Sequence, residues 1–245
     1  LFLVYQPQFN LSTGMICGAE SLIRWNHPTL GSIPPSQFIS IIEKRGLIIK
    51  LGNWIMDQAC KQIIQWQSQS FKLNRLAVNL SALQLRNDKT FQALIDIINE
   101  NNVDAKYIEF ELTESLLIKL SPEVQALIEQ TSKQGIHYAI DDFGTGYSSL
   151  SYLKRIKANK LKIDQEFIQD MLNEPSDMEI VKATIALAHS LGMAIIAEGV
   201  ETQAQLTRLK ELGCDAAQGY FFSRPVAPEE FLEKFRNWQS DCHTQ

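Results

Sequence analysis

The sequence predicts an α/β fold, a closed (β/α)8 barrel of the TIM type. Short β-like runs alternate with helical stretches along the whole chain, which is the pattern of a parallel sheet covered by helices. Eight such runs occur in 245 residues, which matches the size of a barrel with one helix per strand. An open doubly wound sheet is the alternative, but no GxGxxG motif follows the first run.

The expected elements follow from apolar periodicity and from residues that start or stop helices. Ser121 precedes Pro122 at the start of one helix, and Gly135, Gly192 and Gly213 each follow the end of one. The strands are expected at residues 2–8, 16–25, 75–80, 107–113, 137–142, 160–164, 193–199 and 215–221. The helices are expected at residues 37–45, 53–67, 89–100, 122–134, 178–191, 202–212 and 229–238.

Composition limits the function classes. The net charge is -5 and no basic cluster occurs, so binding to long nucleic acid is disfavoured. The cysteines, Cys17, Cys60, Cys214 and Cys242, lack CxxC spacing, which favours reduced thiols and a cytoplasmic location. No apolar stretch has the length of a membrane span. The chain starts without methionine, as expected of one domain, residues 1–245, cut from a longer protein. Whether that longer protein carries a membrane anchor is left open by the sequence.

Strand alternation predicts which side chains face the barrel interior. In residues 108–113 the apolar side chains share one face, which leaves Glu109, Glu111 and Thr113 on the other. The same division places Asp141 inward and Asp142 at the rim. One polar residue from each strand is then expected at the carboxyl ends, where barrels carry active sites: Gln6, Glu20, Asn79, Glu111, Asp141, Lys162, Glu198 and Gln218.

So many carboxylates in one cavity repel one another unless cations neutralise them. The oxygen-rich ligand set suits Mg²⁺ or Mn²⁺ better than zinc, and it comprises Glu20, Asn79, Glu111, Asp141 and Asp142. Two such ions about 3.5 to 4 Å apart typically serve phosphodiester hydrolysis. Lys162 would orient the attacking water or offset charge on the phosphate, and Arg24 would hold a phosphate oxygen.

Each residue has an ordinary structural explanation when it is taken alone. Asn79 is a possible helix cap, Asp142 a turn residue, and Glu109 a member of a buried network. Lys162 is a possible partner for Asp164. In the same way, Glu20 and Glu111 fit surface carboxylates, Glu114 a loop carboxylate and Gln218 a packed amide. All of these separate explanations holding at once would be a coincidence, because eight strands each end in a polar group that is compatible with one shared site.

The segment FGTGYSS, residues 143–149, lacks the lysine of a phosphate-binding loop. We therefore interpret it as a lid over the metals, with hinges at Gly144 and Gly146. The lid residues are Phe143, Gly144, Thr145, Gly146, Tyr147 and Ser148.

These motifs together resemble the EAL domain family, the cyclic di-GMP phosphodiesterase module of bacterial signalling. The resemblance covers the whole chain through ten blocks in order: YQPQ, GAESLIRW, IPPSQFI, VNLSA, ELTES, DDFGTGYSSL, LKIDQEFI, AHSLGM, AEGVET and AQGYFFSRP. One departure is the signature itself, which is Glu-Ser-Leu with Ser21 in place of alanine. By alternation Ser21 faces away from Glu20, so little effect is expected.

The resemblance implies roles for the residues that match its motifs. It makes Glu20, Asn79, Glu111, Asp141 and Asp142 metal ligands and gives Lys162, Glu198 and Gln218 catalytic roles. It places Gln6, Leu22 and Arg24 at the substrate, and Glu114 as the anchor of the lid near a dimer interface. It also implies an antiparallel first strand, a homodimer, and upstream sensory or GGDEF-type domains.

The leading hypothesis is therefore a Mg²⁺- or Mn²⁺-dependent hydrolase that opens cyclic di-GMP to linear pGpG. The base for the attacking water is Glu198 or a metal. A receptor domain that binds the nucleotide without cleaving it is the alternative, although such a domain is expected to have lost ligands. An unrelated metal-dependent barrel enzyme is a third hypothesis, disfavoured by the YQP and lid blocks.

Overall fold

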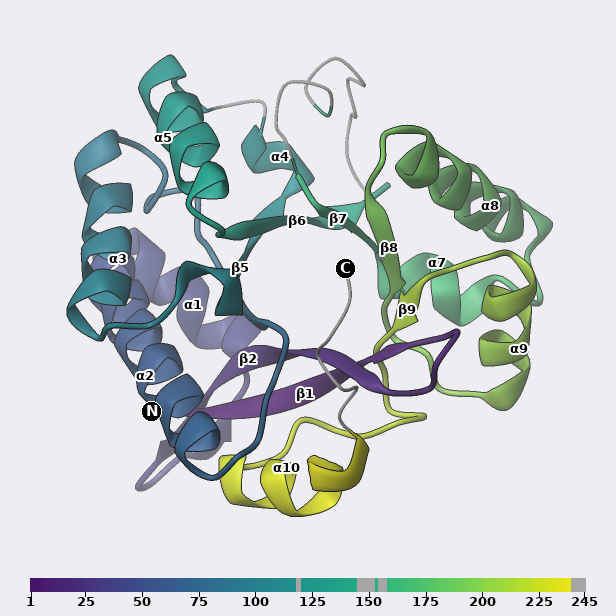
Figure 1. Ribbon diagram of the computed structural model, residues 1–245, viewed down its shortest axis with the longest axis horizontal. Coiled ribbons are helices and arrows are strands. Elements are labelled where there is room, and N and C mark those ends of the chain that lie inside the picture. The colour runs from purple at the N-terminus through teal and green to yellow at the C-terminus, as the bar shows by residue number, and fades with distance from the viewer. Residues whose placement is uncertain (118–119, 145–152, 154–157, 239–245) are drawn as a thin grey trace.

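The strands form a closed barrel with helices around it (Figure 1). The computed structural model describes residues 1–117, 120–144, 153 and 158–238. The sheet order is β1-β9-β8-β7-β6-β5-β4-β2-β3, and pairing of β1 with β2 closes the ring. The strands are β1 (Phe2–Asn10), β2 (Ile16–His27), β3 (Gly31–Ile33), β4 (Leu76–Asn79), β5 (Ile108–Thr113), β6 (His137–Phe143), β7 (Lys160–Ile163), β8 (Ala194–Ala197) and β9 (Ala216–Ala217).

The predicted (β/α)8 barrel and its antiparallel first strand are both confirmed. Strand β1 runs antiparallel to both of its neighbours, β2 and β9. The pairs from β2 through β4 and on to β9 are parallel. Strand β3 was not predicted, and among the described strands it pairs with the outer end of β2 alone, outside the barrel ring. The strand predicted at residues 215–221 is much shorter, because only Ala216 and Ala217 keep ladder pairing.

Helices cover the outside of the strands. They are α1 (Pro35–Lys44), α2 (Ile48–Ser68), α3 (Asp88–Glu100), α4 (Glu114–Leu117), α5 (Pro122–Lys133), α7 (Gln165–Asp170), α8 (Pro175–Ser190), α9 (Gln203–Glu211) and α10 (Pro228–Phe235), with 3-10 turns at Ala105–Tyr107 and Arg236–Trp238. The expected start signal at Ser121 is confirmed, since its hydroxyl accepts a hydrogen bond from Val124 N. The short helices α4 and α7 follow strands directly and were not predicted.

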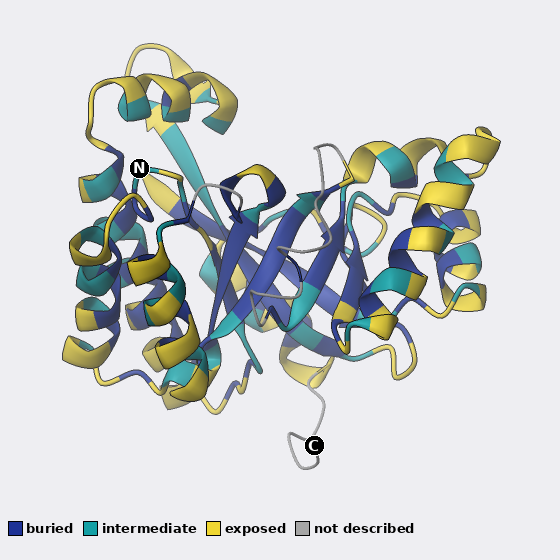
Figure 2. Cartoon of the chain, turned by 90° about the horizontal axis from the view of Figure 1, so that it is seen from above, coloured by how far each residue is buried: buried dark blue, intermediate teal, exposed yellow. Residues whose placement is uncertain are grey.

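The core lies between the strands and the helices. Figure 2 shows the strands buried and the outer helix faces exposed. Ile108, Phe110 and Leu112, the apolar face of β5, are fully buried, and Phe110 packs edge-on against Phe91 of α3 at 5.8 Å between ring centroids. Removing such an aromatic side chain costs about 3 to 5 kcal/mol. Because this face points outward, the opposite face of the same strand is directed into the barrel.

None of the helices in the described part of the chain is long and apolar enough to cross a membrane.

Candidate active site

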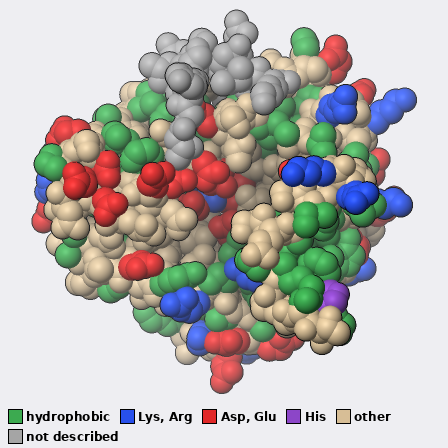
Figure 3. Space-filling view, turned by 180° about the vertical axis from the view of Figure 1, so that it is seen from behind, with side chains coloured by type: hydrophobic (Ala, Val, Ile, Leu, Met, Phe, Trp, Pro, Cys, Tyr) green, Lys and Arg blue, Asp and Glu red, His purple; other side chains and the backbone are tan. Residues whose placement is uncertain are grey.

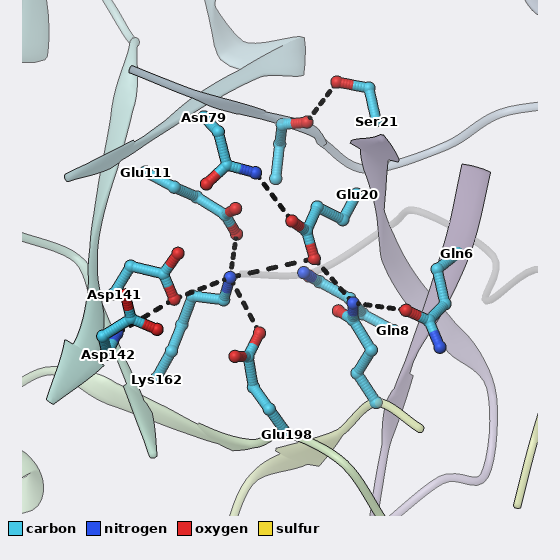
Figure 4. Close-up of polar contacts among 12 residues, drawn as sticks. Gln6, Gln8, Glu20, Ser21, Asn79, Glu111, Asp141, Asp142, Lys162 and Glu198 are labelled. Atoms are coloured by element: carbon cyan, nitrogen blue, oxygen red, sulfur yellow. Dashed lines mark hydrogen bonds and ion pairs between the residues drawn. The ribbon is translucent and has the colours of Figure 1, made fainter. Parts of the chain in front are cut away.

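Polar side chains from all eight barrel strands meet at one end of the barrel (Figure 4). This is the carboxyl end of the parallel strands, where barrel enzymes place their chemistry. Glu198 and Gln218 follow directly after β8 and β9, while the other members lie within their strands. The structure thus brings together the eight residues expected from alternation, namely Gln6, Glu20, Asn79, Glu111, Asp141, Lys162, Glu198 and Gln218.

The ammonium group of Lys162 occupies the centre of the carboxylate cluster. Its Nζ lies 2.8 Å from Glu198 Oε1, 2.9 Å from Glu111 Oε1 and 2.9 Å from Asp141 Oδ1. Glu20 Oε2 is further away, at 3.8 Å. The side chain of Lys162 is 1% exposed, so these carboxylates replace water around it. The predicted alternative partner of Lys162, Asp164, instead caps α7 by accepting a hydrogen bond from Glu166 N.

Neighbouring amides hold Glu20 in place. Asn79 Nδ2 donates a hydrogen bond of 2.7 Å to Glu20 Oε1, and Gln218 Nε2 donates one of 2.6 Å to Oε2. Gln218 Nε2 also lies 3.0 Å from Gln6 Oε1, and Gln6 Nε2 donates to the carbonyl oxygen of Ser223. Each of the two Glu20 oxygens therefore has its own amide donor, one at the end of β4 and one just after β9, which fixes the direction of the carboxylate.

A break in the strand register allows two adjacent aspartates to reach the same cavity. Pairing of β6 with β7 shifts between Ile140 and Phe143. At this point Asp142 has φ of 52°, a left-handed conformation that aspartate tolerates better than most residues. One oxygen from each of Asp141, Asp142 and Glu198 then lies within 4.8 Å of the others. Irregularities of this kind commonly redirect side chains near active sites.

Burial raises the pKa of three carboxyl groups of the cluster in the protein alone, namely Glu111, Asp142 and Glu198. Burial raises the pKa of Glu198 to about 8, with Lys162 opposing the shift and Asp141 adding to it. Burial and the neighbouring Asp141 raise the pKa of Asp142 to about 6. Burial also raises the pKa of Glu111 well above its usual value. Burial lowers the pKa of Lys162, but the surrounding carboxylates outweigh it and hold that pKa well above the usual value.

This donor set fits a divalent cation. Among the described residues, no donor reaches the buried atoms Glu111 Oε2 and Gln218 Oε1, while Glu111 Oε1 lies against the Lys162 ammonium group. Buried acceptors without donors are rare unless an ion or water serves them. The three clustered carboxylates, Asp141, Asp142 and Glu198, supply further oxygen ligands of the hard type that Mg²⁺ and Mn²⁺ prefer.

A cavity of about 350 Å³ opens directly over the cluster. Figure 3 shows acidic side chains gathered at a hollow in this face of the molecule. The expected substrate residues Gln6, Leu22 and Arg24 line the cavity. Sequence reasoning missed seven further lining residues, although each follows the carboxyl end of a strand, which was the available signal: Gln165, Gln169, Gly199, Glu201, Gly219, Tyr220 and Pro225.

Glu114 contacts the start of the expected lid. Its Oε2 accepts a hydrogen bond of 3.2 Å from Gly144 N, and its buried Oε1 has no hydrogen-bond partner within the described part of the chain. Gly144 has φ of 103°, where a side chain would be strained, and Phe143 is buried. Thr145, Gly146, Tyr147 and Ser148, the other expected lid residues, lie outside the described residues.

Comparison with known proteins establishes the family. A model of the EAL domain matches residues 1–225. A solved structure of the PaMucR phosphodiesterase in complex with c-di-GMP superposes with a TM-score of 0.90 at 40% identity, covering 94% of each chain. The chain belongs to the EAL domain family. The resemblance seen in the sequence motifs is thereby confirmed.

Curated relatives of this EAL domain are signalling proteins. The bifunctional diguanylate cyclase/cyclic di-GMP phosphodiesterase MucR of Pseudomonas aeruginosa is 40% identical over 232 residues, covering 95% of this chain and 34% of MucR. The cyclic di-GMP phosphodiesterase NbdA of the same organism is 39% identical over 239 residues, covering 96% of this chain and 30% of NbdA. The chain thus spans about a third of the length of these relatives.

Proposed function

We propose that this EAL domain hydrolyses cyclic di-GMP to linear pGpG with the help of two divalent cations, Mg²⁺ or Mn²⁺. The observation that carries the proposal is the convergence of Glu20, Asn79, Glu111, Asp141 and Asp142 around buried Lys162 beneath an open cavity. The c-di-GMP complex of the PaMucR phosphodiesterase, which shares the fold and 40% of the sequence, supports the choice of substrate.

The residues divide the proposed reaction between them. Bound divalent ions would supply a polarised water and hold the phosphate oxygens. The carboxylate of Glu198, which lies beside Lys162 and lines the cavity, accepts the proton of the attacking water. The oxygen of that water forms the new bond to phosphorus, the bond between phosphorus and the bridging ribose oxygen breaks, and that oxygen leaves with the proton that Glu198 accepted. Lys162 stabilises the charge that develops on the phosphate, and Arg24 at the rim holds the second phosphate.

Hydrolysis of cyclic di-GMP, followed by chromatographic separation of pGpG, tests the proposal. We expect pGpG with MnCl2 or MgCl2, none with EDTA, and none from Glu20→Ala or Lys162→Ala. Lys182→Ala is the matched control, because Lys182 forms its ion pair with Glu179 on the exposed surface of α8. If the wild-type chain bound cyclic di-GMP but never yielded pGpG, the domain would be a receptor for the nucleotide and not an enzyme.

The same proposal includes the setting of the domain. Residues 1–245 form one phosphodiesterase domain of a longer cytoplasmic or membrane-anchored signalling protein, with sensory or GGDEF-type domains upstream. The relatives' greater length supports this setting. We also propose a homodimer formed through the barrel, which light scattering after gel filtration tests: a monomer at all concentrations contradicts it.

A further inference from the structure

A second layer of buried charges lies beneath the candidate active site. Lys160 Nζ is 2.6 Å from Glu109 Oε1, and their side chains are 12% and 1% exposed. The same ammonium group donates a hydrogen bond of 3.1 Å to Gln8 Oε1. The cation site proposed above does not use any of these three residues.

Strand register fixes this layer relative to the site. Glu109 lies two residues before Glu111 on β5, and Lys160 lies two residues before Lys162 on β7. Alternation therefore directs both side chains to the interior, one step further from the mouth. Gln8 follows Gln6 by two residues on β1, which runs in the opposite direction and so reaches the same depth.

Small residues make room for the layer. Ala77 of β4 is paired with Glu109, and Ala139 of β6 is paired with Lys160, so each of these two positions adds only a methyl group, whereas His137 of β6 is also paired with Glu109. Gly18 is paired with Gln8, and a Cβ at position 18 would lie 2.9 Å from Gln8 Oε1. The interior is thus shaped to hold the Lys160–Glu109–Gln8 group.

The pair carries no net charge while both members are present. A positive charge and a negative charge 2.6 Å apart largely cancel at the distance of the layer above. Losing either member leaves one buried charge close to the cation ligands, where solvent screens it weakly.

Nearby Arg75 contacts His137 at 2.9 Å between Nη2 and Nε2. Burial, reinforced by Arg75, lowers the pKa of His137 to about 4, so His137 adds no charge at pH 7.

We propose that the buried Lys160–Glu109 pair sets the affinity of the active site for divalent cations, as a pair of positioning residues whose charges must balance. The proposal rests on the function proposed above, because it concerns the cations of that site. It predicts effects of opposite sign: loss of Lys160 leaves a negative charge that strengthens cation binding, whereas loss of Glu109 leaves a positive charge that weakens it.

The test is calorimetric titration of the metal-free protein with Mn²⁺, without substrate. Lys160→Met should bind Mn²⁺ about tenfold more tightly and Glu109→Gln about tenfold more weakly. The double variant should return to within about twofold of wild type. Thermal melts accompany the titrations, because both single variants strand a buried charge and both melting temperatures should fall.

Three further variants keep the outcome clear. Lys160→Gln removes the charge but keeps a donor for Glu109, and it replaces Lys160→Met if that variant does not fold. The exposed Lys182–Glu179 pair, also 2.6 Å apart, supplies the matched controls Lys182→Met and Glu179→Gln, which should change affinity less than twofold. Circular dichroism and gel filtration establish that each titrated variant is folded.

If the Lys160–Glu109 pair had only a structural role, both single variants would bind Mn²⁺ more weakly, or both would bind it as the wild type does. Either result overturns this inference and leaves the proposed function standing. A wild-type chain that binds no Mn²⁺ overturns the proposed function and this inference with it.

Discussion

Lys162 places its ammonium nitrogen 2.9 Å from the carboxylate of Asp141, on the neighbouring strand, where the lysine side chain is 1% exposed. Glu111 and Glu198 lie equally close to the same nitrogen. A single positive charge therefore offsets several negative ones, and the balance that remains is negative. This residual charge is what favours binding of divalent cations.

Lys162→Met tests the role of this ammonium group. We expect kcat to fall at least about 100-fold, because the charge that developed on the phosphate loses its partner. Mn²⁺ affinity should persist or increase, because a competing positive charge has gone. Steady-state kinetics and calorimetric titration measure the two effects separately.

The control for Lys162→Met is Lys182→Met, which removes a partly exposed lysine from α8 and should leave both quantities unchanged. A Lys162→Met protein with near-normal kcat would show that the ammonium group has only a packing role.

The stability of the metal-free domain should fall as pH rises from about 5 to 9. Burial raises the pKa of Glu198 to about 8 in the folded protein, above the usual value of 4.5. The folded state therefore binds the proton more tightly than the unfolded chain, and this stabilisation is complete at low pH and is lost as pH rises through about 8. Asp142, with a pKa of about 6, contributes in the same direction over a lower pH range.

Urea unfolding in EDTA at several pH values measures this dependence. Glu198→Gln should flatten the slope between pH 6 and 9, whereas exposed Glu179→Gln should not change it. Saturating Mn²⁺ should reverse the trend, because cation binding requires deprotonated carboxylates and stabilises only the folded chain. Equal slopes for wild type and Glu198→Gln would show that Glu198 does not titrate abnormally.

Strand alternation was sufficient to place most of the site. On β5 it put Glu111 inward because Ile108, Phe110 and Leu112 needed the helix side, and the structure shows this division. The same rule left Asp142 at the rim, because no sequence signal marks the register shift that turns Asp142 toward Asp141 and Glu198. Alternation also predicted a last strand that continues beyond Ala217, whereas in the structure the pairing of β9 with its neighbours ends at that residue.

The cavity rim was harder to predict for a different physical reason. Tyr220 and Glu201 belong to loops after strand ends, and loop direction depends on tertiary contacts rather than on a repeating pattern. The guanidinium carbon of Arg224 lies 4.1 Å from the centroid of the Tyr220 ring. No periodic pattern in the sequence predicts this contact. Glu109 was expected only as a possible member of a buried network, and its pairing with Lys160 was not predicted, because the two residues lie 51 positions apart in sequence.

Glu114 should control how the site responds to metal. Its carboxylate accepts the Gly144 N–H at the segment that follows the metal-ligand candidates Asp141 and Asp142. Glu114→Ala removes that acceptor from a buried position, so we expect hydrolysis at low Mn²⁺ concentration to fall about tenfold, with partial recovery at saturating Mn²⁺. The Mn²⁺ dependence of the initial rate measures it.

Exposed Glu123→Ala, at the start of α5, is the matched control for Glu114→Ala. An unchanged Mn²⁺ dependence in Glu114→Ala would mean that Glu114 does not anchor the Gly144 segment.

Ser21→Ala restores the alanine of the family signature, and we expect it to be nearly silent. Ser21 Oγ donates a hydrogen bond of 2.8 Å to the carbonyl oxygen of Ala77, and Figure 4 shows it directed away from the Lys162 ammonium group. The contact joins β2 to β4 but touches none of the ligand candidates. Removing it should change the free energy of unfolding by no more than about 1 kcal/mol and the rate of hydrolysis by less than about threefold.

A rate change above tenfold would instead show that the hydroxyl group, through the β2–β4 contact, sets the distance between Glu20 and Asn79, whose side chains hydrogen bond at 2.7 Å. Equal activity of the two forms would confine the effect of Ser21 to the packing between the strands.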